Sequence, residues 1–206
     1  MPLGSADEFR HPPQSAHHMT VEEFVAWAGD GRWQLVDGEP RAMSPASATH
    51  GIIQTNVGYT LTHHLRATGS PCRVVTEPAI VPRVRARSNM RVPDLAVTCA
   101  DVGAGLTALP DPVLIVEILS PTNESDTWEN VWTYVSIPSV QEVLVLRSSS
   151  VAADLLRRNS DGTWPGEPIQ ISQDGTLHLE TMALTCPLAE LYIGTYLARG
   201  ARPATA

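Results

Sequence analysis

The sequence predicts an α/β fold with a mixed central β-sheet flanked by helices, and three observations support this. Apolar residues Ile53, Val57, Leu61 and Leu65 recur every four positions, as on the buried face of a helix. Residues 113–119 are apolar apart from one glutamate, which is typical of a strand covered on both faces. Helix-like and strand-like segments do not alternate regularly, which favours a mixed sheet over a doubly wound one.

The N-terminal third predicts a helix, a hairpin and a longer helix. Thr20 and Glu23 have the spacing of a capping box at the start of a short helix. The Asp37-Gly38 pair is a strong two-residue turn signal between two strands. The expected elements are a short helix after Thr20, strands over 33–36 and 40–43, and a helix from Ser47 or Thr49 to about Arg66, ended by Gly69.

The remaining residues predict mostly strands, with one further long helix that Ser120 and its neighbours cap and Pro138 stops. We expect that helix to bury one apolar face, made of Trp128, Val131, Trp132 and Val135. The expected elements are strands over 73–77, 79–85, 91–99, 113–119 and 140–146, a helix over 120–135, hairpin strands over 151–157, 168–171 and 176–180, and a short helix over 187–192.

A length of 206 residues favours one domain with its own core. We expect residues 1–18 to be a disordered leader or expression tag, 19–197 to be the domain, and 198–206 to be a flexible tail. No run of 18 apolar residues is present, so we expect no membrane span. The leader also lacks the continuous apolar stretch of a secretory signal, so we expect a cytoplasmic protein.

The charged residues exclude several functions. The formal net charge is −8, and all 14 basic residues are arginine. Without lysine, a Schiff base, a GxxxxGK[ST] phosphate loop and a Ser-x-x-Lys nucleophile are all excluded. The three cysteines, Cys72, Cys99 and Cys186, lie too far apart in sequence for a zinc knuckle, and we expect buried, reduced thiols.

Two carboxylates stand where burial is costly. Glu117 interrupts the apolar run 113–119, and Asp94 follows Pro93 at the start of another predicted strand. Carboxylates on neighbouring strands can share one hard divalent cation. The alternative is that Glu117 forms a buried ion pair with an arginine, while Asp94 is an ordinary strand-edge residue.

Arginines gather just before Asp94. Between residues 73 and 91 five arginines face one glutamate in an otherwise acidic chain. We expect Arg83, Arg85 and Arg87 to alternate on one face of a strand or its turn and, with Arg91, to bind DNA phosphates. The alternative is a solvated arginine-rich hairpin.

Four segments, taken in order, carry a resemblance to a known family: WQLVDGE at 33–39, Met43-Ser-Pro45 followed by His50, VPDLAV at 92–97, and VEILSP at 116–121 with Asp126 and Tyr134 beyond. Together they resemble the Uma2 family of restriction-endonuclease-like proteins, over about residues 19–195. The resemblance implies the PD-(D/E)xK nuclease fold, with Asp94 and Glu117 binding a catalytic metal ion.

Two positions depart from the family pattern. Gln34 stands where members usually have glutamate, and Asn130 stands where they usually have lysine. The spacing of Asp126, Asn130 and Tyr134 puts them on one helical face, which the family geometry turns toward the carboxylates. Asparagine can hold a water molecule but supplies no positive charge. His50 either lines the cleft or caps its helix.

The residues and the resemblance together predict a DNA endonuclease that uses Mg²⁺ (or Mn²⁺) held by Asp94, Glu117 and the backbone carbonyl of Ile118. Gln34, His50 and Asn130 would line its cleft. The alternative is the same fold with weakened or lost catalysis, acting as a DNA-binding or protein-interaction module. A two-carboxylate hydrolase of sugars is more remote, since aromatic residues are few. By analogy with the fold, we expect a homodimer.

Overall fold

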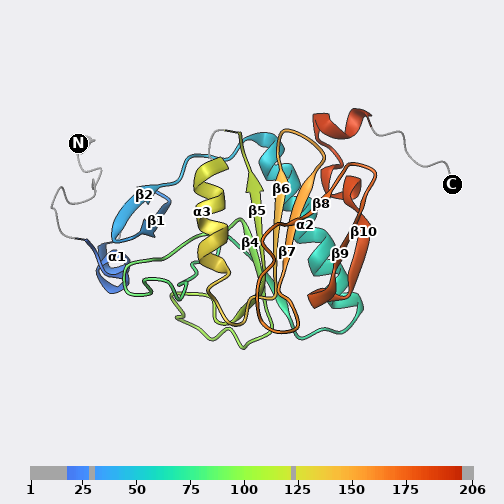
Figure 1. The fold of residues 1–206 in the computed structure, drawn as a ribbon. Helices are drawn as coiled ribbons and strands as arrows, with labels where there is room; N and C mark the ends of the chain where they lie inside the picture. Colours follow the sequence, from blue (N-terminus) through green and yellow to red (C-terminus); the bar gives the residue numbers. More distant parts are fainter. Residues whose placement is uncertain (1–17, 28–30, 122–123, 201–206) are drawn as a thin grey trace, which may run out of the picture.

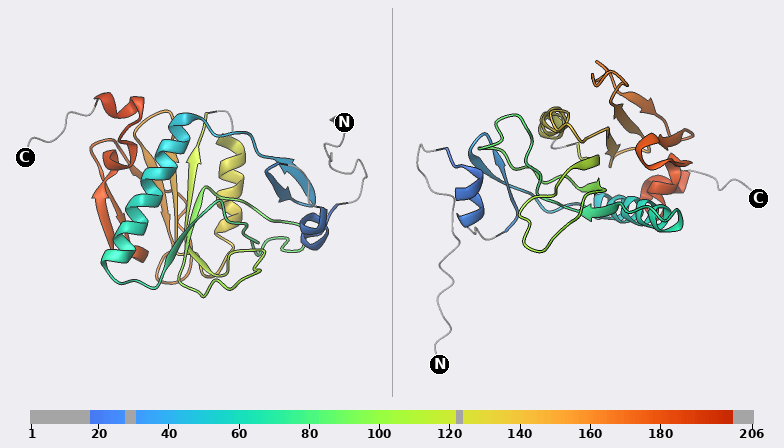
Figure 2. Two further views of the ribbon diagram at one scale, coloured as in Figure 1. Left: turned by 180° about the vertical axis from the view of Figure 1, so that it is seen from behind. Right: turned by 90° about the horizontal axis from the view of Figure 1, so that it is seen from below.

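The computed structural model describes residues 18–27, 31–121 and 124–200. Within them, one mixed β-sheet has helix α2 on one face and helix α3 on the other (Figure 1 and Figure 2). The predicted fold class is therefore confirmed. The elements are α1 Val21–Trp27, β1 Trp33–Val36, β2 Glu39–Ala42, α2 Ala48–Ala67, β3 Arg73–Thr76, β4 Leu95–Thr98, β5 Pro112–Leu119, α3 Glu124–Tyr134, β6 Glu142–Arg147, β7 Ala153–Arg157, β8 Ile169–Ile171, β9 Thr176–Leu179 and β10 Leu184–Pro187, with 3₁₀ helices η1 Glu180–Met182, η2 Leu188–Tyr192 and η3 Tyr196–Gly200.

The main sheet has the strand order β3-β4-β5-β6-β7-β8 in the described part of the chain. Strands β5 and β6 are parallel, with Glu117 opposite Val145, and the other neighbours are antiparallel. Helix α3 makes the crossover that a parallel pair requires. The apolar run is thus an inner strand, as predicted.

Side chains of β5 point alternately into two cores. Val116 and Ile118 pack with the buried face of α2, whereas Ile115 and Leu119 pack with Val131 and Tyr134 of α3. Since side chains two residues apart share a face, Glu117 lies on the α3 side. Sheet geometry therefore directs this carboxylate toward α3.

Capping signals at the starts of α1 and α2 are confirmed, whereas the cap predicted for α3 includes residues 122–123, which lie outside the described residues. The backbone N–H of Thr20 donates to Glu23 Oε2 at 2.7 Å, and the N–H of Glu23 donates to Thr20 Oγ1 at 3.2 Å. Ser47 caps α2, because its hydroxyl accepts from the N–H of His50 at 3.2 Å. The predicted hairpin is also present, with its turn at Asp37-Gly38.

The strand predicted over 79–85 is wrong. In this stretch Ile80 makes an isolated bridge with Arg91, and residues 83–87 form a turn in which Arg85 has a positive φ of 49°. The strand predicted over 91–99 shortens to β4, because Pro93 has no N–H to donate. Alternation of arginines therefore does not indicate a strand face here.

The apolar face predicted for α3 is correct at Val131 and, in part, at Trp128, but wrong at Trp132. The residues that α3 buries are Thr127, Asn130, Val131 and Tyr134, while Trp132 is 48% exposed. The helix covers the face of β5 that contains Glu117, so its inward face includes polar residues. Local hydrophobicity favours the tryptophans, but the position of the sheet decides the phase.

The prediction of reduced thiols is wrong for two cysteines and correct for the third. Cys72 and Cys99 form a disulfide, whereas Cys186 is free and buried. Pairing of Arg73 with Thr98 places the two cysteines side by side, one position beyond the end of the β3–β4 ladder. This pairing depends on strand register, which the spacing of cysteines in the sequence does not reveal.

The C-terminal part adds a small sheet. The predicted strand over 176–180 pairs, as β9, with β10, which the sequence did not predict. The helix predicted at 187–192 is the 3₁₀ helix η2. Residues 1–17 of the expected leader and 201–206 of the expected tail lie outside the described residues. The last residue of the expected leader, His18, contacts Asp37, with its Nδ1 atom 2.6 Å from the Asp37 carbonyl oxygen. Among the helices in the described residues, none has the length and apolarity to cross a membrane.

Candidate active site

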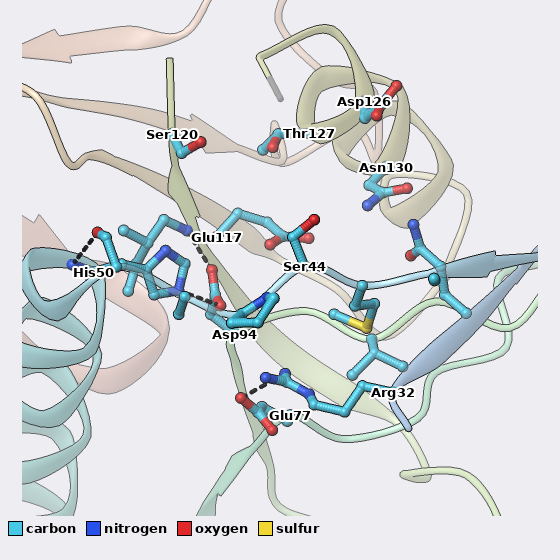
Figure 3. A pocket seen from close by; sticks show the side chains of 18 residues that line it. Arg32, Ser44, His50, Glu77, Asp94, Glu117, Ser120, Asp126, Thr127 and Asn130 are labelled. Atoms are coloured by element: carbon cyan, nitrogen blue, oxygen red, sulfur yellow. Dashed lines mark hydrogen bonds and ion pairs between the residues drawn. The ribbon is translucent and has the colours of Figure 1, made fainter. Parts of the chain in front are cut away.

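One pocket gathers all five side chains predicted for catalysis. It encloses about 480 Å³ between the hairpin β1–β2, the start of α2, the end of β5 and the N-terminal half of α3. The predicted residues that line it are Gln34, His50, Asp94, Glu117 and Asn130. Figure 3 shows His50, Asp94, Glu117 and Asn130 around this space. Sequence positions as far apart as 34 and 130 thus meet at one site.

Different elements position these residues. Asp94 lies just before β4, after Pro93, which has no N–H for a ladder hydrogen bond. Glu117 lies on the α3 side of β5. His50 stands in the first turn of α2, held by the Ser47 cap. Gln34 comes from β1 and Asn130 from the inward face of α3.

Asp94 is fixed through both carboxylate oxygens. Its Oδ1 lies 2.7 Å from Nε2 of His50, and its Oδ2 accepts from the backbone N–H of Ile118 at 2.6 Å. Its backbone carbonyl accepts from Gln54 Nε2 at 3.0 Å. The carboxylate is therefore held at a defined place beside the end of β5.

Glu117 is 7% exposed, and Tyr134 donates its hydroxyl to Glu117 Oε1 at 2.8 Å. Burial raises the pKa of Glu117 well above its usual range, and the nearby negative charge of Asp94 raises it further. Burial and Glu117 also raise the pKa of Tyr134, which stays a neutral donor. No ion pair joins Glu117 to an arginine in the described residues, so the buried-ion-pair alternative does not hold there.

The two neutral amides also face the pocket. The Oε1 atom of Gln34 is buried and has no hydrogen-bond partner among the described residues. Asn130 is almost fully buried and lines the same space. Because a buried carbonyl oxygen without a partner is costly, Gln34 presents an acceptor that a bound group would satisfy.

The predicted helical face of Asp126, Asn130 and Tyr134 is confirmed. Asp126 and Asn130 line the pocket. Tyr134, one turn further along the helix, donates its hydroxyl to Glu117. Figure 3 shows Asp126, Thr127 and Asn130 projecting from α3 toward the cleft.

Several lining residues were not predicted. Arg32 and Glu77 lie on the side of Asp94 away from α3 and form an ion pair with N–O distance 2.6 Å (Figure 3). Ser44, Ser47 and Ser120 also line the pocket. No motif marks Arg32, just before one predicted strand, or Glu77, the last residue of another, and only the fold brings them together.

The four arginines predicted to bind DNA lie outside this pocket. Arg83, Arg85 and Arg87 are exposed in the turn 83–87, and Arg85 pairs with Asp37 at the tip of the hairpin. Arg91 is different, because it is only 2% exposed and burial lowers its pKa. The surface contact predicted for Arg91 is therefore wrong, since its guanidinium is enclosed by the protein.

Acidic groups dominate the pocket. Its described lining holds Glu77, Asp94, Glu117 and Asp126 against one arginine, Arg32. No group of three or more His, Cys, Asp or Glu side chains is arranged as a metal cluster in residues 18–27, 31–121 and 124–200. Among these carboxylates, Asp94 lies close enough to Glu117 for its charge to raise the Glu117 pKa, after the larger effect of burial. Any ion between them would need further ligands from backbone or water oxygens.

Asp94 and Glu117 thus line one pocket at the end of an inner strand of a mixed sheet. The fold is similar to the crystal structure of "a putative nuclease belonging to DUF820" from Anabaena variabilis ATCC 29413. The TM-score is 0.69 at 16% sequence identity, and the match covers 84% of this chain and 97% of the other. This likeness establishes the fold.

The chain belongs to the Uma2 family, described as "Putative restriction endonuclease", whose sequence profile matches residues 21–189. A relative, an uncharacterized protein of Synechocystis sp. (strain ATCC 27184 / PCC 6803 / Kazusa), is 29% identical over 180 residues. That match covers 85% of this chain and 92% of the relative. The predicted family membership is confirmed.

Proposed function

We propose that this protein is a divalent-metal-dependent DNA endonuclease whose ion is held by Asp94 and Glu117. The observation that supports this most is the juxtaposition of these two carboxylates at the end of β5, one of them buried and without an arginine partner. Membership of a nuclease-like family agrees with it.

The donor set fits Mg²⁺ or Mn²⁺. Both ions prefer oxygen ligands, and the two carboxylates offer them beside an acceptor, Gln34 Oε1, that lacks a partner. Burial and, after it, the charge of Asp94 raise the pKa of Glu117, and a bound cation would offset both effects. When bound, the ion would neutralise charge on the scissile phosphate and lower the pKa of a water ligand.

The surrounding residues have definite tasks in this proposal. His50 and the backbone N–H of Ile118 hold Asp94, and Tyr134 holds Glu117. Asn130, from the opposite wall, would orient the attacking water through its amide. The exposed guanidinium groups of Arg83 and Arg87 would contact phosphates of a longer duplex, and a homodimer would present two such sites to the two strands.

The experiment is a calorimetric titration of Mg²⁺ and Mn²⁺ with a plasmid-nicking assay on the same preparations. The variants are Asp94→Ala, Glu117→Ala and, as control, Asp101→Asn, an exposed aspartate beyond the other end of β4. We expect binding and nicking in the parent and the control, and neither in the two site variants. Absence of metal binding by the parent would contradict the proposal.

A second candidate function rests on Asn130. The residue that faces the carboxylates from α3 is neutral, and the chain holds no lysine to replace it. The protein would then be a nuclease-fold module with weakened catalysis that binds DNA or a protein. Metal binding without nicking, together with nicking gained by Asn130→Lys, would favour this alternative.

A further inference from the structure

Arg32 and Glu77 form an ion pair that neither the predicted motifs nor the proposed catalytic residues explain. The pair joins the residue before β1 to the residue after β3, and both side chains line the pocket. Arg32 is the one arginine in the described lining, among four carboxylates. Any phosphate that enters this pocket thus meets one guanidinium group on the protein.

The position of Glu77 is specified by the backbone. Glu77 has φ of 51°, in the left-handed region that favours glycine, and its N–H donates to the carbonyl of Asp94 at 3.0 Å. This conformation costs free energy in a residue with a side chain. The chain nevertheless fixes a carboxylate there, directly beside a proposed metal ligand.

Glu77 of this ion pair lies where two cavities meet. Glu77 lines the pocket and, in addition, a neighbouring groove of about 520 Å³ between α2 and the edge strand β3. The groove is lined otherwise by neutral side chains, among them Gln54, Thr55 and Thr76. A polymer that occupied both the pocket and the groove would therefore contact Glu77 in each.

The pair is exposed enough to open. The side chains of Arg32 and Glu77 are 43% and 38% exposed, so their attraction is screened by water. A guanidinium group binds phosphate through two parallel hydrogen bonds, at least as well as it binds a carboxylate. Exchange of one partner for the other therefore needs no rearrangement of buried groups.

We propose that Arg32 is the phosphate-binding residue of this site and that Glu77 is its resting partner, displaced by a backbone phosphate of the nucleic acid. The inference rests on the proposed function for its substrate, and it adds the group that draws a phosphate into an acidic pocket. Glu77 in this scheme lowers affinity for anions when no substrate is bound.

The chain offers a matched control pair. Arg41 lies on the same hairpin and pairs with Glu129 at 3.9 Å, with exposed fractions of 45% and 49%, and neither residue lines the pocket. Arg41→Gln and Glu129→Gln thus make the same changes of charge as Arg32→Gln and Glu77→Gln, outside the pocket lining.

The test measures binding of a short fluorescein-labelled DNA duplex by anisotropy, with Ca²⁺ present, over a series of salt concentrations. We expect Arg32→Gln to weaken binding about tenfold, as for one charge-assisted contact, and to lower the salt slope by about 1. Glu77→Gln should tighten binding roughly two- to fivefold, as for loss of an exposed competing ion pair. In the double variant Arg32→Gln/Glu77→Gln, the tighter DNA binding caused by Glu77→Gln should disappear.

Thermal unfolding of each variant confirms that the fold is intact. Equal weakening by Arg32→Gln and Arg41→Gln would overturn the inference while the proposed function stands. The inference would also be overturned if Glu77→Gln tightened binding in the Arg32→Gln background. It would be overturned as well if Glu77→Gln tightened binding no more than Glu129→Gln does. If the parent neither binds nor nicks DNA, the proposed function fails, and this inference fails with it.

Discussion

Glu117 and Glu142 are two buried glutamates on adjacent parallel strands, and their surroundings differ. Glu142, at 0% exposure, receives hydrogen bonds from Arg157 Nε at 2.8 Å and from the backbone N–H groups of Glu180 and Thr181 at 3.1 and 2.9 Å. Glu117 accepts from the hydroxyl of Tyr134 and lies beside a second acid, Asp94. Burial alone therefore does not distinguish a structural acid from a functional one.

The difference lies in how each charge is satisfied. A cation and two N–H groups surround Glu142 from inside the protein, so nothing from solvent is needed. Glu117 stands at the pocket wall with a like charge as neighbour, so its ionised form lacks compensation unless a cation binds. The comparison teaches that an under-compensated buried acid next to a cavity is the one to examine for chemistry.

The largest expected effect is on the structural side of this comparison. Glu142→Ala takes one acceptor from the partly buried guanidinium of Arg157 and removes the acceptor of two backbone N–H groups, so we expect a loss of about 3–5 kcal/mol in unfolding free energy. Urea denaturation measures it. A loss below that of an average surface substitution would mean that Glu142 is not a structural anchor.

The opposite pattern is expected for Glu117→Gln. The amide keeps the shape but removes a buried charge beside Asp94, so the metal-free protein should be no less stable than the parent. Under the proposed function, nicking should fall by on the order of 10²–10³ or more. The check pairs urea denaturation in EDTA with plasmid nicking in Mg²⁺, and marked destabilisation with nicking retained would reverse the assignment of the two glutamates.

A pH series sharpens the comparison further. The pKa of Glu117 is raised in the folded protein, so its contribution to stability is complete below the unfolded value of about 4.3 and is lost as pH rises through the folded value. Between these two values the loss approaches about 1.4 kcal/mol per pH unit.

The measurement is urea denaturation in EDTA from pH 4.5 to 8, for the parent and for Glu117→Gln. The difference between the two isolates Glu117, since other groups titrate in both. A difference that stays flat with pH would contradict the raised pKa, whereas addition of Mg²⁺ should reduce the loss at high pH.

The smallest expected effect concerns the tyrosine that holds Glu117. Tyr134→Phe removes a hydrogen bond to a carboxylate and should cost about 1.5–3 kcal/mol in unfolding free energy at pH 8. The control is Tyr192→Phe, which removes a bond to the neutral carbonyl of Ala152 and should cost about 0.5–1.5 kcal/mol. Nicking should fall in Tyr134→Phe only. Equal effects of both variants on nicking would assign Tyr134 to the core alone.

Much of the site was predictable because its residues carry local signals. Asp94 after Pro93 and Glu117 inside an apolar run are conspicuous in the sequence, and the i, i+4, i+8 spacing places Asn130 between Asp126 and Tyr134. Arg32 and Glu77 carry no such signal. Their meaning comes from a contact across 45 positions that only the folded chain creates.

By itself, the sequence determined the kinds of elements, the inner strand, the helix caps and the two acids, since apolar periodicity, turn residues and capping residues act over a few positions. The tertiary structure decided which face α3 buries, that Cys72 meets Cys99, that Arg91 is enclosed while Arg83 is exposed, and which buried glutamate is compensated. Those outcomes depend on register and on packing between distant segments, where the free energy of burial and pairing overrides local preference.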